Sequence, residues 1–424
     1  MTPIADDETL QRCPPDRRRN LLVAAEVAFL AGIVLLPVMQ FATVRAFGTV
    51  IIPSDVCFGI AAIGVAVVEL GRRGAALRAG FVLVAICYFG ALVIAAVASP
   101  DRRESVERIA IDGYCVVLGL TALVLARDAA ARMRIARAWV AGTVLTVVAA
   151  LAGVALFYLG ERTPAENFAI GDLGSIHTTS VPRVVGFFLN ANLFCNYLVV
   201  GLLFTLGLLG WRRPAGLVLV GAIGVTLAFT LSPGLGGAIV AVALWVVLSE
   251  RGWSGRARGL VLASGIGGAV VFLVLTVTVG PRAHTWAEAV ETVRAHPLLG
   301  VGPGLPVAAT FQDGRLFTDA HNAWLNVAGQ AGVLGLLGFV GVVGAICLLA
   351  WRARPLGAVE EPVRAGWCAF VGAVLYGSLS LSLEQSRHVW VLLGFLAAGL
   401  GAAVRRGADE APTRSYEVRR SIGR

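Results

Sequence analysis

The sequence predicts an all-α polytopic membrane protein with about twelve transmembrane helices. Of its 424 residues, 57% are hydrophobic and 14% are charged, and the mean hydropathy is +0.80. A soluble domain of this length exposes more polar surface than this composition can supply. The 51 glycines favour the same class, because membrane helices use small residues to bring their backbones into contact.

Each transmembrane helix needs about 20 apolar residues, within a range of roughly 17–25. Apolar stretches near this length recur along the chain, and two of them, 215–231 and 235–250, are marginal. The twelve stretches are 21–37, 53–70, 79–98, 110–126, 137–160, 184–210, 215–231, 235–250, 259–280, 323–350, 364–382 and 388–404.

The arginines orient these stretches. All 35 basic residues are arginine, and most fall in cytoplasmic stretches if the N-terminus is cytoplasmic, in line with the positive-inside rule. We therefore expect both termini inside, with a cytoplasmic arm over 1–20 and a disordered tail over 405–424. Residues 21–404 form one transmembrane domain with two long outer loops, 160–183 and 281–322. The net charge of +9 requires no nucleic acid, since the inner loops account for it.

The second outer loop holds a polar segment rich in glycine. Apolar residues from Trp286 to Val293 recur at helical spacing, which predicts a short amphipathic helix along the membrane interface. This helix should end near His296, because Pro297 disfavours helical backbone in the preceding residue. Three glycines then follow between 300 and 304 and allow a tight turn, although a loop that re-enters a helix bundle could use the same spacing.

His321 is the candidate general base. It lies at the start of the stretch 323–350, next to Asn322 and two residues after Asp319. An unperturbed histidine has a pKa of about 6.5, so its imidazole can accept a proton near neutral pH. The polar neighbours could hold one tautomer. An interfacial histidine is also a common polar anchor, which is the alternative interpretation.

Two further polar elements fall on the same outer face. Arg183 precedes the amides Asn190 and Asn192 in the sixth stretch, and Arg387 lies between the last two stretches. Polar groups at membrane depth are costly and usually face a cavity or each other. Guanidinium groups suit bidentate binding of phosphate, with ordinary interfacial anchoring as the alternative. The candidate diphosphate- and substrate-binding residues are Arg183, Arg282, Arg315, Arg387, Asn190, Asn192 and Asn322.

Five motifs follow one another between residues 183 and 395. They are RxxGxxxNxN from Arg183 to Asn192, RxxxW from Arg282 to Trp286, HPLxGxGPG from His296 to Gly304, HNxxLxxxxxxGxxG from His321 to Gly335, and RxxW from Arg387 to Trp390. Their order resembles the O-antigen ligase and O-antigen polymerase superfamily of bacterial envelope enzymes. The first five stretches agree with that family in number and hydropathy alone.

The sequence departs from the family pattern at two positions. Many members carry arginine where this chain has Pro233, after Thr230 and Ser232. Members also often have glutamate where this chain has Gln330. These differences concern the identity of the donor or the acceptor.

The resemblance implies a glycosyltransferase of GT-C-like architecture in the bacterial inner membrane, with its active site facing the periplasm. It implies inverting transfer of a glycan from undecaprenyl diphosphate to an acceptor such as lipid A-core, with His321 as the base. A polymerase that extends a glycan with the same lipid-linked donor needs the same groups and is the nearest alternative. An anion transporter is the alternative from another class. The sequence shows no paired acidic motif, and we expect no metal, no cofactor and no nucleic-acid partner.

Overall fold

The computed structural model describes residues 15–40, 44–46, 49–70, 80–160, 181–250, 252–276, 279–312, 315–356, 359–380 and 386–422. Within these residues the chain forms thirteen helices and two short antiparallel hairpins. Seven of the described helices are long and apolar enough to cross a membrane. The protein is therefore an all-helical, polytopic membrane protein.

The helices are α1 (Pro15–Leu35), α2 (Pro53–Leu70), α3 (Gly80–Ala98), α4 (Arg102–Leu125), α5 (Ala129–Tyr158), α7 (Ala191–Leu209), α8 (Pro214–Phe229), α9 (Gly234–Ser249), α10 (Gly255–Thr276), α11 (Val279–Ala295), α12 (Ala323–Arg352), α13 (Glu361–Ser380) and α14 (Arg387–Ile422). The hairpins pair β1 (Val44–Ala46) with β2 (Thr49–Ile51), and β3 (Thr310–Gln312) with β4 (Arg315–Phe317). Each of the twelve predicted apolar stretches overlaps one of these helices, and the two marginal stretches coincide with α8 and α9, of 16 residues each.

Helix α7 begins later than the predicted stretch 184–210. Residues 181–190 form an irregular segment in which Gly186 has a φ of +56°. The side chain of Asn190 then caps the helix, because its Oδ1 accepts the backbone N–H groups of Asn192 and Leu193 at 2.6 and 3.3 Å. The two asparagines therefore lie at the start of α7 rather than a few turns inside it.

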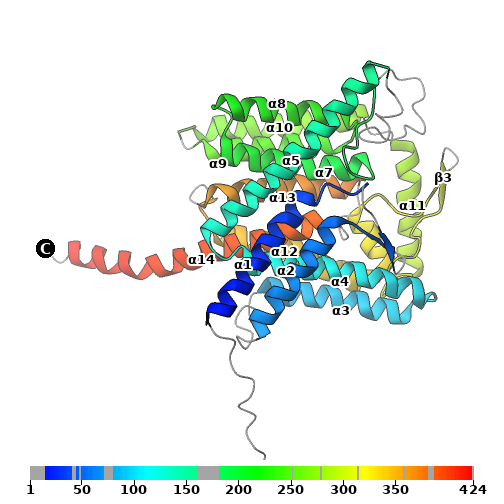
Figure 1. Cartoon of the computed structure of the whole chain (residues 1–424), viewed down its shortest axis with the longest axis horizontal. Coiled ribbons are helices and arrows are strands. Elements are labelled where there is room, and N and C mark those ends of the chain that lie inside the picture. The colour runs from blue at the N-terminus through cyan, green and yellow to red at the C-terminus, as the bar shows by residue number, and fades with distance from the viewer. Residues whose placement is uncertain are drawn as a thin grey trace, which may run out of the picture.

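The tail and the hairpins also differ from expectation. Helix α14 continues to Ile422, beyond the start of the predicted disordered tail at Arg405, and it projects away from the bundle in Figure 1. A helix already nucleated in the bundle extends with one hydrogen bond for each residue added. Strands were not expected, yet runs of β-branched and aromatic residues, such as Thr49–Ile51 and Thr310–Gln312, form short pairs between the helices.

Helix α11 confirms the predicted amphipathic helix and ends at Ala295, one residue before His296. Most other helices run alongside one another, whereas α11 lies across one end of the bundle, at the right of Figure 1. We call this end, which carries residues 181–190, α11, residues 296–322 and the start of α14, the loop-rich end. The opposite end carries the starts of α5 and α13 together with Arg406, and we call it the arginine-rich end.

Glycine contacts bring the buried helices close together, as the composition predicts. A Cβ atom on Gly394 of α14 would lie 1.9 Å from the carbonyl oxygen of Gly119 in α4. A Cβ atom on Gly237 of α9 would lie 2.6 Å from the carbonyl oxygen of Gly372 in α13. These positions admit no side chain, so α14 and α13 can pack deep in the bundle and carry polar groups to its loop-rich end.

Candidate functional site

Arg183 lies in the segment before α7 and is held by neutral groups. Its Nε donates to the carbonyl oxygen of Thr230 at 3.0 Å, and a terminal nitrogen donates to Oδ1 of Asn192 at 3.1 Å. Burial lowers the pKa of the Arg183 side chain. Among the described residues no carboxylate pairs with it. The guanidinium is therefore fixed in place while its positive charge is left uncompensated there.

Asn192 connects this arginine to α13. Its Oδ1 also accepts a hydrogen bond from Oγ of Ser232 at 2.9 Å, and that hydroxyl lies 2.7 Å from the hydroxyl of Tyr376. Ser232 and Pro233 form the tight connection between α8 and α9, where the chain departs from the family pattern. Tyr376 comes from the last two turns of α13. A chain of side-chain contacts therefore runs from Arg183 to the end of α13.

His321 lies in a strained turn at the start of α12. Its φ is +48°, a region that residues with side chains rarely adopt. Its backbone N–H donates to Oδ1 of Asp319 at 2.5 Å. Asn322 then caps α12, accepting the N–H groups of Trp324 and Leu325 at 3.0 and 3.1 Å. Such strain costs roughly 1–3 kcal/mol and persists where the surroundings fix it, often at functional sites.

The His321 turn is also anchored to α13. Nδ2 of Asn322 donates to the carbonyl oxygen of Ser378 at 2.7 Å, and Nε1 of Trp324 donates to Oγ of Ser378 at 2.7 Å. Ser378 lies two residues after Tyr376 in the same helix. The Arg183 group and the His321 group thus meet opposite sides of the same short stretch of α13, and both lie at the loop-rich end.

The glycine-rich segment after α11 fills a break in α12. Gly332 has a φ of +63° and a ψ of −162°, which interrupts the helix. The N–H groups of residues 301–302 donate to the carbonyls of residues 329–330 at 2.9 and 3.0 Å, and Val333 donates to the carbonyl of Pro297 at 2.8 Å. The inserted loop therefore pairs backbone groups that the break releases, as groups within a membrane require.

The glycines make this insertion possible. Gly300, Gly302 and Gly304 all have positive φ, which confirms the predicted turn. A Cβ atom on Gly300 would lie 2.4 Å from the backbone carbon of Gln330, and one on Gly332 would lie 2.2 Å from the backbone of Leu298. The glycine spacing thus fits both interpretations that the sequence left open, a tight turn and a loop that re-enters the helix bundle.

Arg387 is placed differently from Arg183. Its guanidinium forms a bidentate pair with Asp55 at the start of α2, with Nε and a terminal nitrogen at 2.7 and 3.0 Å from the two carboxylate oxygens. Tyr114 of α4 donates to the same carboxylate at 2.8 Å. Arg387 therefore joins α14, α2 and α4, with its charge matched by a carboxylate.

The neighbouring His388 is fully buried. Its Nε2 lies 2.6 Å from Oδ1 of Asn196, whose amide nitrogen donates to the carbonyl of Ala373 at 3.4 Å. These contacts assign the ring proton to Nε2. Within the described residues, Nδ1 has no hydrogen-bond partner. Because no surface of His388 is exposed, it cannot reach a hydroxyl arriving from outside, whereas His321 is partly exposed.

Two predicted site residues have undescribed side chains. Arg282 lies near the start of α11 and Arg315 begins β4, both at the loop-rich end. Their helix and hairpin are nevertheless tied together, because Oγ1 of Thr292 donates to the carbonyl of Val307 at 2.9 Å and Glu288 accepts the N–H of Ala309 at 2.8 Å.

The structure joins Arg183 directly to Asn192. It anchors Asn322, and with it the His321 turn, to α13, the helix that Asn192 also reaches through Ser232. It uses the side-chain oxygens of Asn190 and Asn322 as helix caps. Sequence reasoning missed Tyr376, Ser378 and Asp55 as partners, although polar residues inside or beside apolar stretches were a usable signal. In the described part of the chain, no group of three histidine, cysteine or acidic residues is placed to hold a metal ion.

A comparison of the chain with protein-family models and with curated proteins finds no match.

Proposed function

We propose that the protein is an inverting glycosyltransferase that moves a glycan from a lipid-linked diphosphate to an acceptor. In this proposal twelve helices span a bacterial inner membrane in a GT-C-like arrangement. The loop-rich end faces the periplasm, and both termini are cytoplasmic. The donor is a glycan on undecaprenyl diphosphate, and the acceptor is a hydroxyl of a sugar such as those of lipid A-core.

One observation carries the proposal. Arg183 is partly buried, rigidly held and paired with neutral partners among the described residues, at the same end as His321. A buried charge without a counter-charge is costly, so an anion is the expected partner of this guanidinium. Two contacts occupy part of its five N–H donors, which leaves donors for a phosphate.

The chemistry follows from these two groups. The oxygen of the acceptor hydroxyl attacks the anomeric carbon of the donor sugar, while His321 takes the hydroxyl proton on an imidazole nitrogen. The bond from the anomeric carbon to the phosphate oxygen breaks, and its electron pair stays with the diphosphate. Arg183 stabilises the charge that develops there. Direct displacement inverts the configuration at the anomeric carbon.

The polyprenyl tail of the donor must stay in the bilayer while its headgroup reacts. The His321 turn and Arg183 both lie beside the last turns of α13, next to the apolar helices of the bundle. This placement suits a substrate with a lipid tail. For an anion transporter, by contrast, a binding site near the middle of the membrane is the usual arrangement.

The direct test is a transfer assay with purified protein and undecaprenyl-diphosphate glycan, with and without lipid A-core acceptor. His321→Ala should lower turnover by about 10²–10⁴-fold, the usual contribution of a general base. The matched control is His284→Ala, an exposed histidine of α11 that pairs with Glu288. Product that appears with the donor alone would identify a polymerase, and product that requires lipid A-core would identify a ligase.

The diphosphate role of Arg183 has a separate readout. Arg183→Lys keeps the charge but loses the planar fork, so donor binding should weaken. Arg212→Lys is the control, since Arg212 is exposed and pairs with Glu250 at the arginine-rich end. Unchanged donor binding in Arg183→Lys together with unchanged turnover in His321→Ala would reject the proposed site.

A further inference from the structure

A cavity lies at the arginine-rich end, away from the site described above. It is a groove of about 1230 Å³ between α3, α4, α12 and α14. Phe339 and Trp390 both pack against Tyr88 between these helices, with ring centroids 5.8 and 6.0 Å from that of Tyr88. The rings of Tyr88 and Trp390 are buried. Along α3, α12 and α14, this aromatic cluster lies between the groove and the loop-rich end. It therefore separates the groove from the site of Arg183 and His321.

The wall of the groove is apolar and open to the side. Phe81 of α3 and Leu349 of α12 line it, with small residues such as Gly344 between them. Leu83 is 64% exposed and Leu348 is 49% exposed, and both lie on its rim. In a membrane protein these exposed side chains face hydrocarbon. The groove therefore opens toward lipid.

The charged mouth of the groove is positive. Arg127, Arg352 and Arg405 are among its lining residues, with Glu69 as the one carboxylate in the described lining. Within the described residues neither Arg352 nor Arg405 pairs with a carboxylate, and Arg127 reaches its neighbour Asp128 at 3.9 Å, with half of its side chain exposed. The positive charges of Arg352 and Arg405, which no carboxylate among the described residues pairs with, are what an anionic headgroup would complement.

The dimensions match one leaflet of a bilayer. The groove follows α12 from Gly341 to Arg352, a rise of about 17 Å at 1.5 Å per residue. The hydrocarbon core of a bilayer is about 30 Å thick, so one leaflet supplies about 15 Å. A lipid whose headgroup lies at Arg352 and Arg405 would therefore extend its acyl chains along the apolar wall and end near the aromatic cluster.

We propose that this groove binds one anionic phospholipid of the leaflet at the arginine-rich end. Its phosphate lies between the guanidiniums of Arg352 and Arg405, with Arg127 beside them, and its acyl chains lie along α3 and α12. This site is separate from Arg183 and His321, so it does not depend on the reaction proposed above.

Native mass spectrometry of the purified full-length protein tests the charge. The protein is released from detergent micelles to which phosphatidylglycerol or phosphatidylcholine has been added. Wild type should retain one phosphatidylglycerol molecule more strongly than it retains phosphatidylcholine. Replacing both Arg352 and Arg405 by glutamine should weaken phosphatidylglycerol retention by roughly fivefold for each arginine lost. The matched control is the double change Arg213→Gln and Arg256→Gln, which removes two exposed arginines from the same end outside the groove.

A steric variant tests the acyl wall separately. A Cβ atom on Gly344 meets no atom within 4 Å, so Gly344→Leu fills the groove without a clash. It should reduce retention of both lipids, whereas Gly221→Leu on α8, equally unobstructed, should behave as wild type. Equal retention of the two lipids by wild type, or undiminished retention in both the double glutamine variant and Gly344→Leu, would overturn the proposal.

Discussion

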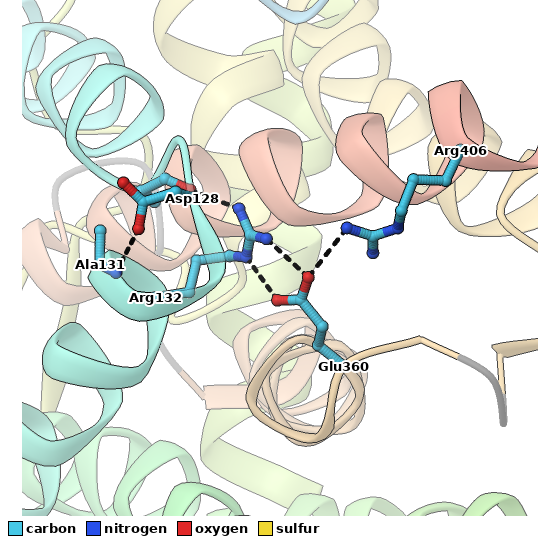
Figure 2. A network of polar contacts seen from close by, with 6 residues as sticks. Asp128, Ala131, Arg132, Glu360 and Arg406 are labelled. Carbon is cyan, nitrogen blue, oxygen red and sulfur yellow. Dashed lines mark hydrogen bonds and ion pairs between the residues drawn. The ribbon is translucent and has the colours of Figure 1, made fainter. Parts of the chain in front are cut away.

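Arg132 and Arg183 lie at opposite ends of the bundle and have different roles. At the arginine-rich end, the side chain of Arg132 is 1% exposed and donates two hydrogen bonds to Glu360, at 2.8 and 2.7 Å. A third goes to the carbonyl of Ala126 at 2.8 Å, and Arg406 approaches the same carboxylate at 3.1 Å. Figure 2 shows this network, which joins the start of α5 to α14 through the residue before α13. Here arginine holds helices together.

At the loop-rich end, Arg183 donates to a carbonyl and an amide. Arg387 lies at the same end, yet it is paired with Asp55 in the same way as Arg132 with Glu360. The end of the bundle at which an arginine lies therefore does not decide what it does. Its partners decide, because a carboxylate compensates the charge, whereas neutral acceptors position the guanidinium and leave the charge available for an anion.

The largest expected effect comes from breaking the Arg132 pair. Arg132→Ala leaves Glu360 without its bidentate partner, and removal of one member of a buried pair typically destabilises a protein by about 3–5 kcal/mol. We expect the lower end of that range, because Glu360 retains Arg406 and part of its side chain is exposed. The thermal unfolding midpoint of the detergent-purified protein measures the loss.

Arg183→Ala is the matched change at the other end. It removes two hydrogen bonds to neutral groups, each worth about 1 kcal/mol, so the fold should lose less than with Arg132→Ala. Its main effect should be on donor binding. If the two variants lowered the unfolding midpoint equally while donor binding stayed intact in Arg183→Ala, the contrast between the ends would disappear.

Lowering the pH should also destabilise the protein through Glu360, by a smaller amount than the two substitutions above. The hydrogen bonds from Arg132 hold the pKa of Glu360 below its ordinary value. A lowered pKa contributes stability that is present above the ordinary value of about 4.3 and is lost as the pH falls through the lowered one. Wild type should therefore lose stability below about pH 4.3.

The comparison variant for this prediction is Glu360→Gln. It should be less stable than wild type at pH 6 and lose less between pH 5 and pH 3, because it has no carboxylate to protonate at this position. The difference between the two unfolding curves isolates Glu360 from other acidic groups. Parallel curves over that range would show that the pair with Arg132 contributes no pH dependence.

The sequence predicted the helices well and their polar contacts poorly. A helix overlaps each of the twelve predicted stretches, and seven of the described helices are long and apolar enough to cross a membrane. The start of α7 was wrong by several residues, since Val184 and Phe188 are as apolar as a helix interior, and the cap of Asn190 and the backbone of Gly186 decide the boundary instead.

The partners of the polar residues could not be predicted from local pattern. Asp55 meets Arg387 across 332 positions of sequence, and the pairing depends on how α2, α4 and α14 pack. The break in α12 at Gly332 was also not anticipated, although the three glycines between 300 and 304 were. A glycine pattern shows which backbone conformations are allowed, whereas the identity of the segment that fills the space depends on the tertiary fold.

The smallest expected effect tests whether Asn190 belongs to the Arg183 site or to the helix. Its side-chain oxygen caps α7 by accepting two backbone N–H groups. Asn190→Ser retains a capping oxygen, so stability should stay within about 0.5 kcal/mol of wild type, whereas Asn190→Ala should lose about 1 kcal/mol. Thermal unfolding in detergent gives both values.

Asn190→Asp separates the two roles further. Aspartate caps a helix as well as asparagine does and suits the positive end of the helix dipole, so the fold should be retained. If Asn190 also contacts the diphosphate, the new carboxylate will repel it and donor binding will weaken in Asn190→Asp while remaining normal in Asn190→Ser. Normal donor binding in both variants would restrict Asn190 to capping and leave Asn192, through its contact with Arg183, as the asparagine that positions the guanidinium.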